Sequence, residues 1–75
     1  MFEQMKELIG NYVDVNADDI TLDSKFIEDL GFNSYDFVSL LGEAEEIFDV
    51  QIDEQEVLNL HTVGDAIAYI EKLKA

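Results

Sequence analysis

The sequence "NSYDFVSLLGEAEEIF", residues 33–48, decides the fold because it has the pattern of one long amphipathic helix. Its apolar residues recur at intervals of three and four positions, which places them on one face of a helix. They are Phe37, Leu40, Leu41, Ala44, Ile47 and Phe48. Asn33 is a good N-cap, and the charge of Asp36 suits the positive end of the helix dipole. We therefore predict a helix over residues 34–48 with one face in a hydrophobic core.

Three further helices are predicted around this one. An amphipathic pattern covers residues 2–14, although Gly10 weakens it slightly. A short helix is predicted over residues 54–58, and the last helix begins at Thr62, a predicted cap with Asp65 three positions later. The expected buried faces are Phe2, Met5, Leu8, Ile9, Tyr12 and Val13 in the first helix, and Val63, Ala66, Ile67, Ile70 and Leu73 in the last.

The connection between the first two long helices, residues 15–33, contains many apolar residues. We expect it to pack onto the helices instead of hanging free, with a helical turn near residues 24–30. No segment has a convincing strand pattern. The predicted fold class is all-α: a small antiparallel four-helix bundle with three main helices, one short helix and a long first loop, forming a single domain over residues 1–75.

Composition restricts the possible functions. The 75 residues allow only a small core and leave little room for a catalytic cleft. The absence of cysteine excludes disulfides, thiol catalysis and cysteine metal sites. The first ten residues do not resemble a signal peptide, and no apolar run is long enough to span a membrane. We therefore expect a monomer in the cytoplasm, with no membrane insertion.

The charge is strongly negative. Four Lys, no Arg and 18 acidic residues give a net charge of −14. Such a surface repels nucleic acid and anionic membranes. It attracts and steers basic protein partners, which we expect here, although an acidic surface also serves solubility alone.

Two chemistries suggested by local residues fail on inspection. A hydrolase nucleophile at Ser34 would need a base and an oriented third group, but the surroundings are not G-x-S-x-G, and the single histidine, His61, has no evident partner. An EF-hand calcium loop over residues 14–25 would need glycine at its sixth position and glutamate at its twelfth, where Asp19 and Lys25 stand. No metal site is therefore predicted, and weak divalent-ion binding by the acidic surface stays open.

A serine that carries a prosthetic group has different requirements, and Ser34 meets them. It must be exposed at a helix start, where a phosphodiester would meet free N–H groups and the positive end of the dipole. No catalytic base is needed, because the reactions take place on partner enzymes. The alternative is an acidic helical interaction or calcium-binding module with an unmodified serine.

The outward face of the central helix is a candidate docking surface. At about 100° per residue, it presents an exposed tyrosine, a valine and a small gap among carboxylates. The candidate docking residues are Tyr35, Asp36, Val38, Ser39, Gly42, Glu45 and Glu46. A solvated face with one stray tyrosine would have the same pattern, so both interpretations stay open.

The segments "LGFNSYDFVSLLGEAEEIFDVQID" and "TVGDAIAYI" resemble the acyl carrier protein family, over nearly the whole chain. The resemblance implies that a phosphopantetheinyl transferase attaches 4′-phosphopantetheine from coenzyme A to Ser34, with Asn33 and Tyr35 as motif neighbours. It implies a carrier that delivers acyl thioesters to partner enzymes and is not itself an enzyme. We also expect the interior to part around an acyl chain, lined by Phe37, Leu41, Ala44, Ile67 and Leu73.

Three positions depart from the pattern of the family. Asn33 stands for aspartate and Tyr35 for leucine, on either side of Ser34, and Asp53 stands where many relatives have proline. These changes keep the carrier role but leave the pathway open. Fatty acid synthesis is the default expectation, with polyketide or specialised lipid synthesis as alternatives. A D-alanyl or peptidyl carrier of the same fold is the runner-up.

Overall fold

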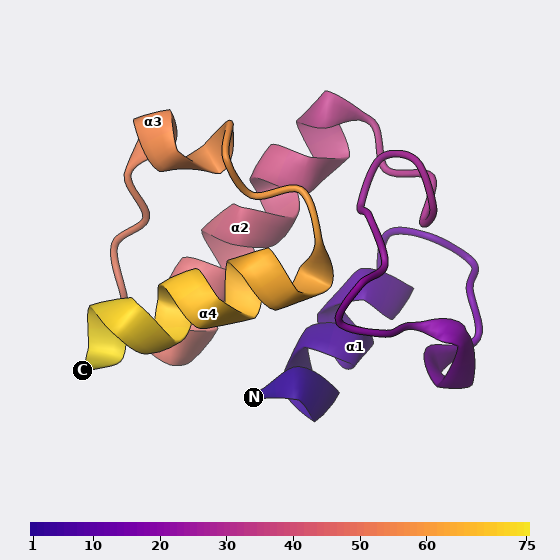
Figure 1. Cartoon of the computed structure of the whole chain (residues 1–75), viewed down its shortest axis with the longest axis horizontal. Coiled ribbons are helices and arrows are strands. Elements are labelled where there is room, and N and C mark those ends of the chain that lie inside the picture. Colours follow the sequence, from indigo (N-terminus) through magenta and orange to yellow (C-terminus); the bar gives the residue numbers. More distant parts are fainter.

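The computed structural model describes residues 1–75 and confirms the all-α fold (Figure 1). Its elements are α1 (Phe2–Gly10), the 3₁₀ helix η1 (Ala17–Asp19), α2 (Ser34–Phe48), α3 (Glu54–Val57) and α4 (Val63–Lys74). Helix α1 contacts both α2 and α4, while the short α3 lies on the opposite side of the molecule from α1. The chain has no strand, only an isolated antiparallel bridge between Lys25 and Thr62.

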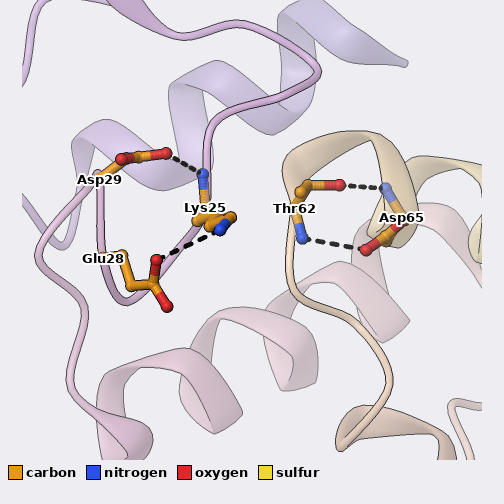
Figure 2. Close-up of polar contacts among 5 residues, drawn as sticks. All are labelled: Lys25, Glu28, Asp29, Thr62 and Asp65. Carbon is orange, nitrogen blue, oxygen red and sulfur yellow. Dashed lines mark hydrogen bonds and ion pairs between the residues drawn. The ribbon is translucent and has the colours of Figure 1, made fainter.

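Side-chain caps fix where α2, α3 and α4 begin. The Oδ1 atom of Asn33 accepts a hydrogen bond from the N–H of Asp36 at 2.7 Å, as the sequence predicts. Thr62 and Asp65 form a reciprocal capping box at the start of α4, with bonds of 3.0 and 3.2 Å (Figure 2). Asp53, the residue at the position of the expected proline, caps α3 by accepting from the N–H of Gln55 at 2.9 Å. Each cap satisfies an N–H group that the helix itself cannot.

The core draws side chains from every long segment, and the largest of those fully buried are Phe26, Met5, Ile9, Leu40, Ile70 and Val63. Phe26 comes from the connection between α1 and α2. Its ring lies 4.8 Å from that of Phe37 and 5.6 Å from that of Phe32, centroid to centroid. The prediction that this connection packs onto the helices is therefore confirmed.

Backbone hydrogen bonds tie the same connection to the start of α4. The N–H of Phe26 donates to the carbonyl of His61 at 3.0 Å, and that of Val63 donates to the carbonyl of Ser24 at 2.9 Å. A third bond, 2.8 Å long, runs from the N–H of Gly64 to the carbonyl of Leu22. The expected helical turn near residues 24–30 is a single turn, closed by the hydrogen bond from the N–H of Asp29 to the carbonyl of Lys25 at 2.9 Å, and it does not continue into a helix.

Several predicted boundaries and faces are wrong in detail. Helix α1 ends at Gly10 and not at residue 14, so Tyr12 and Val13 pack against the core from outside the helix. Ile47 is 51 % exposed and Leu73 is 39 % exposed, although both were expected in buried stripes. Each lies ten positions after the first core residue of its helix, which puts it about 80° from the centre of the stripe, in the last turn.

Candidate functional site

Ser34 is the first residue of α2, and buried neighbours fix its position. Leu30 and Phe32 are both buried, and the N–H of Phe32 donates to the carbonyl of Phe26 at 2.9 Å. Gly31 between them has a φ of +81°, a left-handed backbone conformation that residues other than glycine rarely adopt. The segment before α2 is thus anchored on both sides of a glycine turn, and Ser34 follows it exposed to solvent.

The first turn of α2 can receive an anion at Ser34. The first N–H groups of a helix have no partner within it. The Asn33 side chain accepts a hydrogen bond from the N–H of Asp36. The N–H groups of Ser34 and Tyr35 remain available to a ligand. These groups and the helix dipole favour negative charge on a group attached to the Ser34 oxygen.

A hollow of about 400 Å³ opens beside Ser34, and we call it the Ser34 hollow. It lies between the connection, the start of α2, and α3 with the residues that follow it. Its apolar lining is Ile27, Phe37, Val38, Val57, Leu58 and Leu60. Lys25, Glu28, Ser34 and His61 are its other lining residues. A group attached to Ser34 thus has an adjacent, mainly apolar recess.

A second hollow, of about 250 Å³, lies farther along α2, and we call it the Glu45 hollow. Its lining is Val38, Leu41, Gly42, Glu45, Ile52, Glu54 and Val57. Val38 of α2 and Val57 of α3 line both hollows, so the two hollows are neighbours along these helices.

The five residues expected to line an acyl cavity are not gathered around one hollow. Phe37 lines the Ser34 hollow and Leu41 the Glu45 hollow, whereas the buried Ala44 and Ile67 line neither. Leu73 lies partly exposed at the end of α4. Their joint role around a cargo stays a prediction. The α3 side of both hollows, with Val57 and Leu58, was missed, although the apolar pair in the short third helix was visible in the sequence.

The expected docking residues differ in how far they are exposed. Tyr35 is 79 % exposed and Val38 60 %, and Gly42 and Glu46 are also exposed. Asp36, Ser39 and Glu45 are only half-exposed. Glu45 is also committed to structure, because its Oε2 atom accepts the N–H of Ile52 at 2.9 Å.

Two further exposed apolar side chains flank the Ser34 hollow. Leu58 is 78 % exposed and Ile27 is 51 % exposed, and both line the hollow with Val38. Tyr35, next to the serine in the sequence, is a further exposed side chain with a large apolar ring, but it does not line the hollow. Reasoning from α2 alone could not find Leu58 and Ile27, because they come from other segments.

The structure gives no support to the rival chemistries. His61 lines the same hollow as Ser34, but its hydrogen bonds are made by its backbone, from its N–H to Asp65 at 3.2 Å and to its carbonyl from Phe26. No carboxylate orients the imidazole ring as a catalytic base requires. The candidate calcium loop instead forms η1, capped by the side chain of Asn16. No group of three or more His, Asp or Glu side chains is placed to hold a metal ion.

Comparison with known proteins agrees with this geometry. The family model described as "Phosphopantetheine attachment site" matches residues 3–70. The acyl carrier protein of Akkermansia muciniphila is 42 % identical over 72 residues, which cover 96 % of this chain and 90 % of the relative. That of Clostridium perfringens is 41 % identical over 70 residues, covering 93 % and 92 %. The chain belongs to the acyl carrier protein family.

A solved structure supports the same assignment. The acyl carrier protein from Enterococcus faecalis matches with a TM-score of 0.84 at 26 % identity, covering 96 % of this chain and 91 % of that one. The prosthetic group of the family is covalently attached 4′-phosphopantetheine. The exposed Ser34 hydroxyl, the available N–H groups and the adjacent hollow fit that group. No helix of this chain has the length and apolar character needed to cross a membrane.

Proposed function

We propose that Ser34 bears the 4′-phosphopantetheine arm and that acyl groups travel on it as thioesters to partner enzymes. The observation that carries this proposal is the exposed hydroxyl of Ser34 at the first position of α2, beside the Ser34 hollow. The bound arm supplies the thiol that this cysteine-free chain lacks. The chain itself contributes the oxygen for attachment, N–H groups facing the phosphate, and a recess next to it.

The proposed role is that of a carrier and not of an enzyme. The serine needs no base, because a phosphopantetheinyl transferase activates it and the later acyl transfers occur on other proteins. The lack of an oriented partner for the His61 ring is consistent with this division of labour. The chain's own task is to present one exposed attachment point on a rigid helix start.

The proposed partners are the transferase and acyl-transfer or synthase enzymes with basic surfaces around their active sites. The net charge of −14 steers such surfaces toward the chain and disfavours nucleic acid. The exposed Tyr35 and Val38 then offer apolar contact area next to the attachment point. The half-exposed Asp36 supplies a charge near it, and Glu46 supplies one farther along the same helix.

We further propose a monomer working in the cytoplasm, in fatty acid synthesis or a polyketide or specialised lipid pathway. The names of the relatives favour an acyl cargo over the D-alanyl or aminoacyl cargo of the runner-up. Loading assays distinguish the two directly. An acyl-loading enzyme should charge the holo protein, and an aminoacyl-activating enzyme should not.

Intact-mass measurement tests the attachment. Incubation with coenzyme A, magnesium and a broad-specificity transferase should add one phosphopantetheine to the wild type and none to Ser34→Ala. Ser39→Ala, on the same helix, is the matched control and should still gain the mass. Ser24→Ala should gain it too, but Ser24 is buried and bonded to Thr21, so that variant needs a check of its fold. Failure of the wild type with several transferases would contradict the proposal.

A further inference from the structure

Basic side chains are scarce in this chain, and their placement is uneven. There are four lysines and one histidine against 18 acidic residues. Lys6 pairs with Glu3 on α1, and Lys72 and Lys74 lie in the last turn of α4. The remaining two, Lys25 and His61, both line the Ser34 hollow. Of the two hollows, the one beside Ser34 is therefore the one that has basic residues among its lining.

Backbone pairing holds these two residues on neighbouring segments. Lys25 and Thr62 form the antiparallel bridge, and Figure 2 shows the two segments facing each other. The bonds from Phe26 to His61 and from Val63 to Ser24 flank it, at 3.0 and 2.9 Å. The placement of Lys25 next to His61 therefore belongs to the folded core and does not depend on a free loop.

Neither side chain is committed to another strong partner. The Nζ atom of Lys25 lies 3.3 Å from the Oε2 atom of Glu28, but this pair is well exposed and such pairs are weak (Figure 2). The imidazole ring of His61 makes no hydrogen bond within the protein. The charged groups around His61 are Lys25 and Glu28 in the hollow wall, and Asp65, whose carboxylate accepts the backbone N–H of His61. Both residues are free to turn toward a phosphate.

The two hollows differ in charge. The Glu45 hollow contains Glu45 and Glu54 and no basic residue, so it would repel a phosphodiester. The Ser34 hollow has one acid, Glu28, against Lys25 and His61. An arm fixed at its phosphate in the first hollow can continue along Val38 and Val57, which both hollows share.

Resting on the attachment at Ser34, we propose that Lys25 and His61 bind the phosphodiester of the arm and direct the arm into the groove between α2 and α3. The ammonium group of Lys25 contributes a charged donor, and the imidazole of His61 contributes an N–H donor in either protonation state. These residues position the arm and take no part in the chemistry on its thiol. They are a feature of this chain's own sequence in an otherwise acidic carrier.

Nuclear magnetic resonance of the holo protein tests this proposal. After mass confirmation of the attached arm, Overhauser contacts are measured between the methyl groups of the arm and those of Val57 and Leu58. The wild type should show these contacts. Lys25→Gln combined with His61→Gln should weaken these contacts by about twofold or more. The control is Lys72→Gln, which removes an exposed lysine of α4 and should leave the contacts unchanged.

A salt series provides a second measurement that needs no variant. Raising the ionic strength from about 0.01 M to about 1 M shortens the Debye length from roughly 30 Å to roughly 3 Å. The contacts should weaken over this range if charge holds the arm. A holo protein whose arm shows no contact with the hollow, or contacts that neither salt nor the double variant reduces, would overturn this inference and leave the attachment intact. A protein that gains no mass would instead overturn the proposed function.

Discussion

At the scale of single residues, Tyr35 is the side chain most able to change which partners accept this carrier. It follows Ser34 directly and is 79 % exposed, so nothing in the fold requires its ring. Aromatic side chains are among the strongest contributors at protein interfaces. Tyr35 stands where the resemblance leads one to expect a smaller leucine, so it adds exposed apolar area next to Ser34.

We expect Tyr35→Ala to lower the kcat/KM of a partner enzyme for this carrier by roughly tenfold, mainly through KM, because an interface anchor is lost. The free energy of unfolding should change by less than about 0.5 kcal/mol, as is usual for an exposed site. Ile47→Ala is the control, an exposed apolar residue in the last turn of the same helix, far from Ser34. Equal effects of both variants on kcat/KM would argue against a docking role for Tyr35.

Tyr12 provides a second prediction at this scale. Its hydroxyl donates a hydrogen bond to Glu43 of α2. This bond, together with partial burial and the charges of Glu43 and Asp36, raises the pKa of Tyr12 from 10.0 to about 12. A group whose pKa is raised on folding contributes stability that is present below its unfolded pKa and is lost as the pH rises through its folded one.

We therefore expect wild type to be more stable than Tyr12→Phe up to about pH 10 and the difference to shrink between about pH 10 and 12. Chemical denaturation of both proteins across this range measures the difference. A gap that stays constant or grows toward pH 12 would show that the hydrogen bond to Glu43 is not its source.

At the scale of elements, the join between the connection and α4 depends on a close backbone approach. A Cβ atom at Gly64 would lie 2.9 Å from the carbonyl oxygen of Leu22, the atom that accepts the N–H of Gly64. Because a backbone oxygen cannot move aside cheaply, the two segments would have to separate. This join also holds Lys25 next to His61, so it supports the wall of the Ser34 hollow.

We expect Gly64→Ala to lower the free energy of unfolding by about 1–3 kcal/mol, measured by denaturant titration. Gly42→Ala is the matched control, since a Cβ there meets no atom within 4 Å and Gly42 lies inside α2. That change should stabilise the protein by about 0.5–1 kcal/mol through helix propensity. Destabilisation by both alanines, or by neither, would contradict this description of the join.

The elements also show what the sequence could and could not predict. Local signals located α2 and the caps at Asn33 and Thr62, because capping depends on residues a few positions apart. The predicted end of α1 was wrong. The helix ends at Gly10, and Tyr12 packs against the core from beyond it. Ile47 and Leu73 were assigned to the core by periodicity, but both lie at the edge of a stripe in a last turn, where no neighbour covers them.

The candidate site shows the same division. Ser34 and Tyr35 could be placed from the pattern of one helix. The hollow could not, because it forms where the connection, α2 and α3 meet, and its wall includes Lys25, Val57 and His61 from distant parts of the chain. The pairing of Lys25 with Thr62 in the folded structure brings Lys25 next to His61, and the packing of α3 adds Val57.

At the scale of the whole molecule, the net charge of −14 is spread over a domain with a radius of gyration of 11.1 Å. Self-repulsion at this density favours the expanded, unfolded chain. We therefore expect the melting temperature to rise as sodium chloride is added up to roughly physiological ionic strength, where the Debye length is about 8 Å. Calorimetry at a series of salt concentrations measures this, and a melting temperature that stayed flat or fell would argue that self-repulsion does not limit stability.

Ser34 is the one residue that we propose turns this small acidic domain into a carrier. The most direct measurement is fragmentation mass spectrometry of the protein after reaction with coenzyme A and a transferase. The added phosphopantetheine should map to Ser34 alone, with Ser24, Ser39 and the threonines unmodified. Modification at any of those residues, or a protein that stays unmodified with transferases that load related carriers, would contradict this proposal.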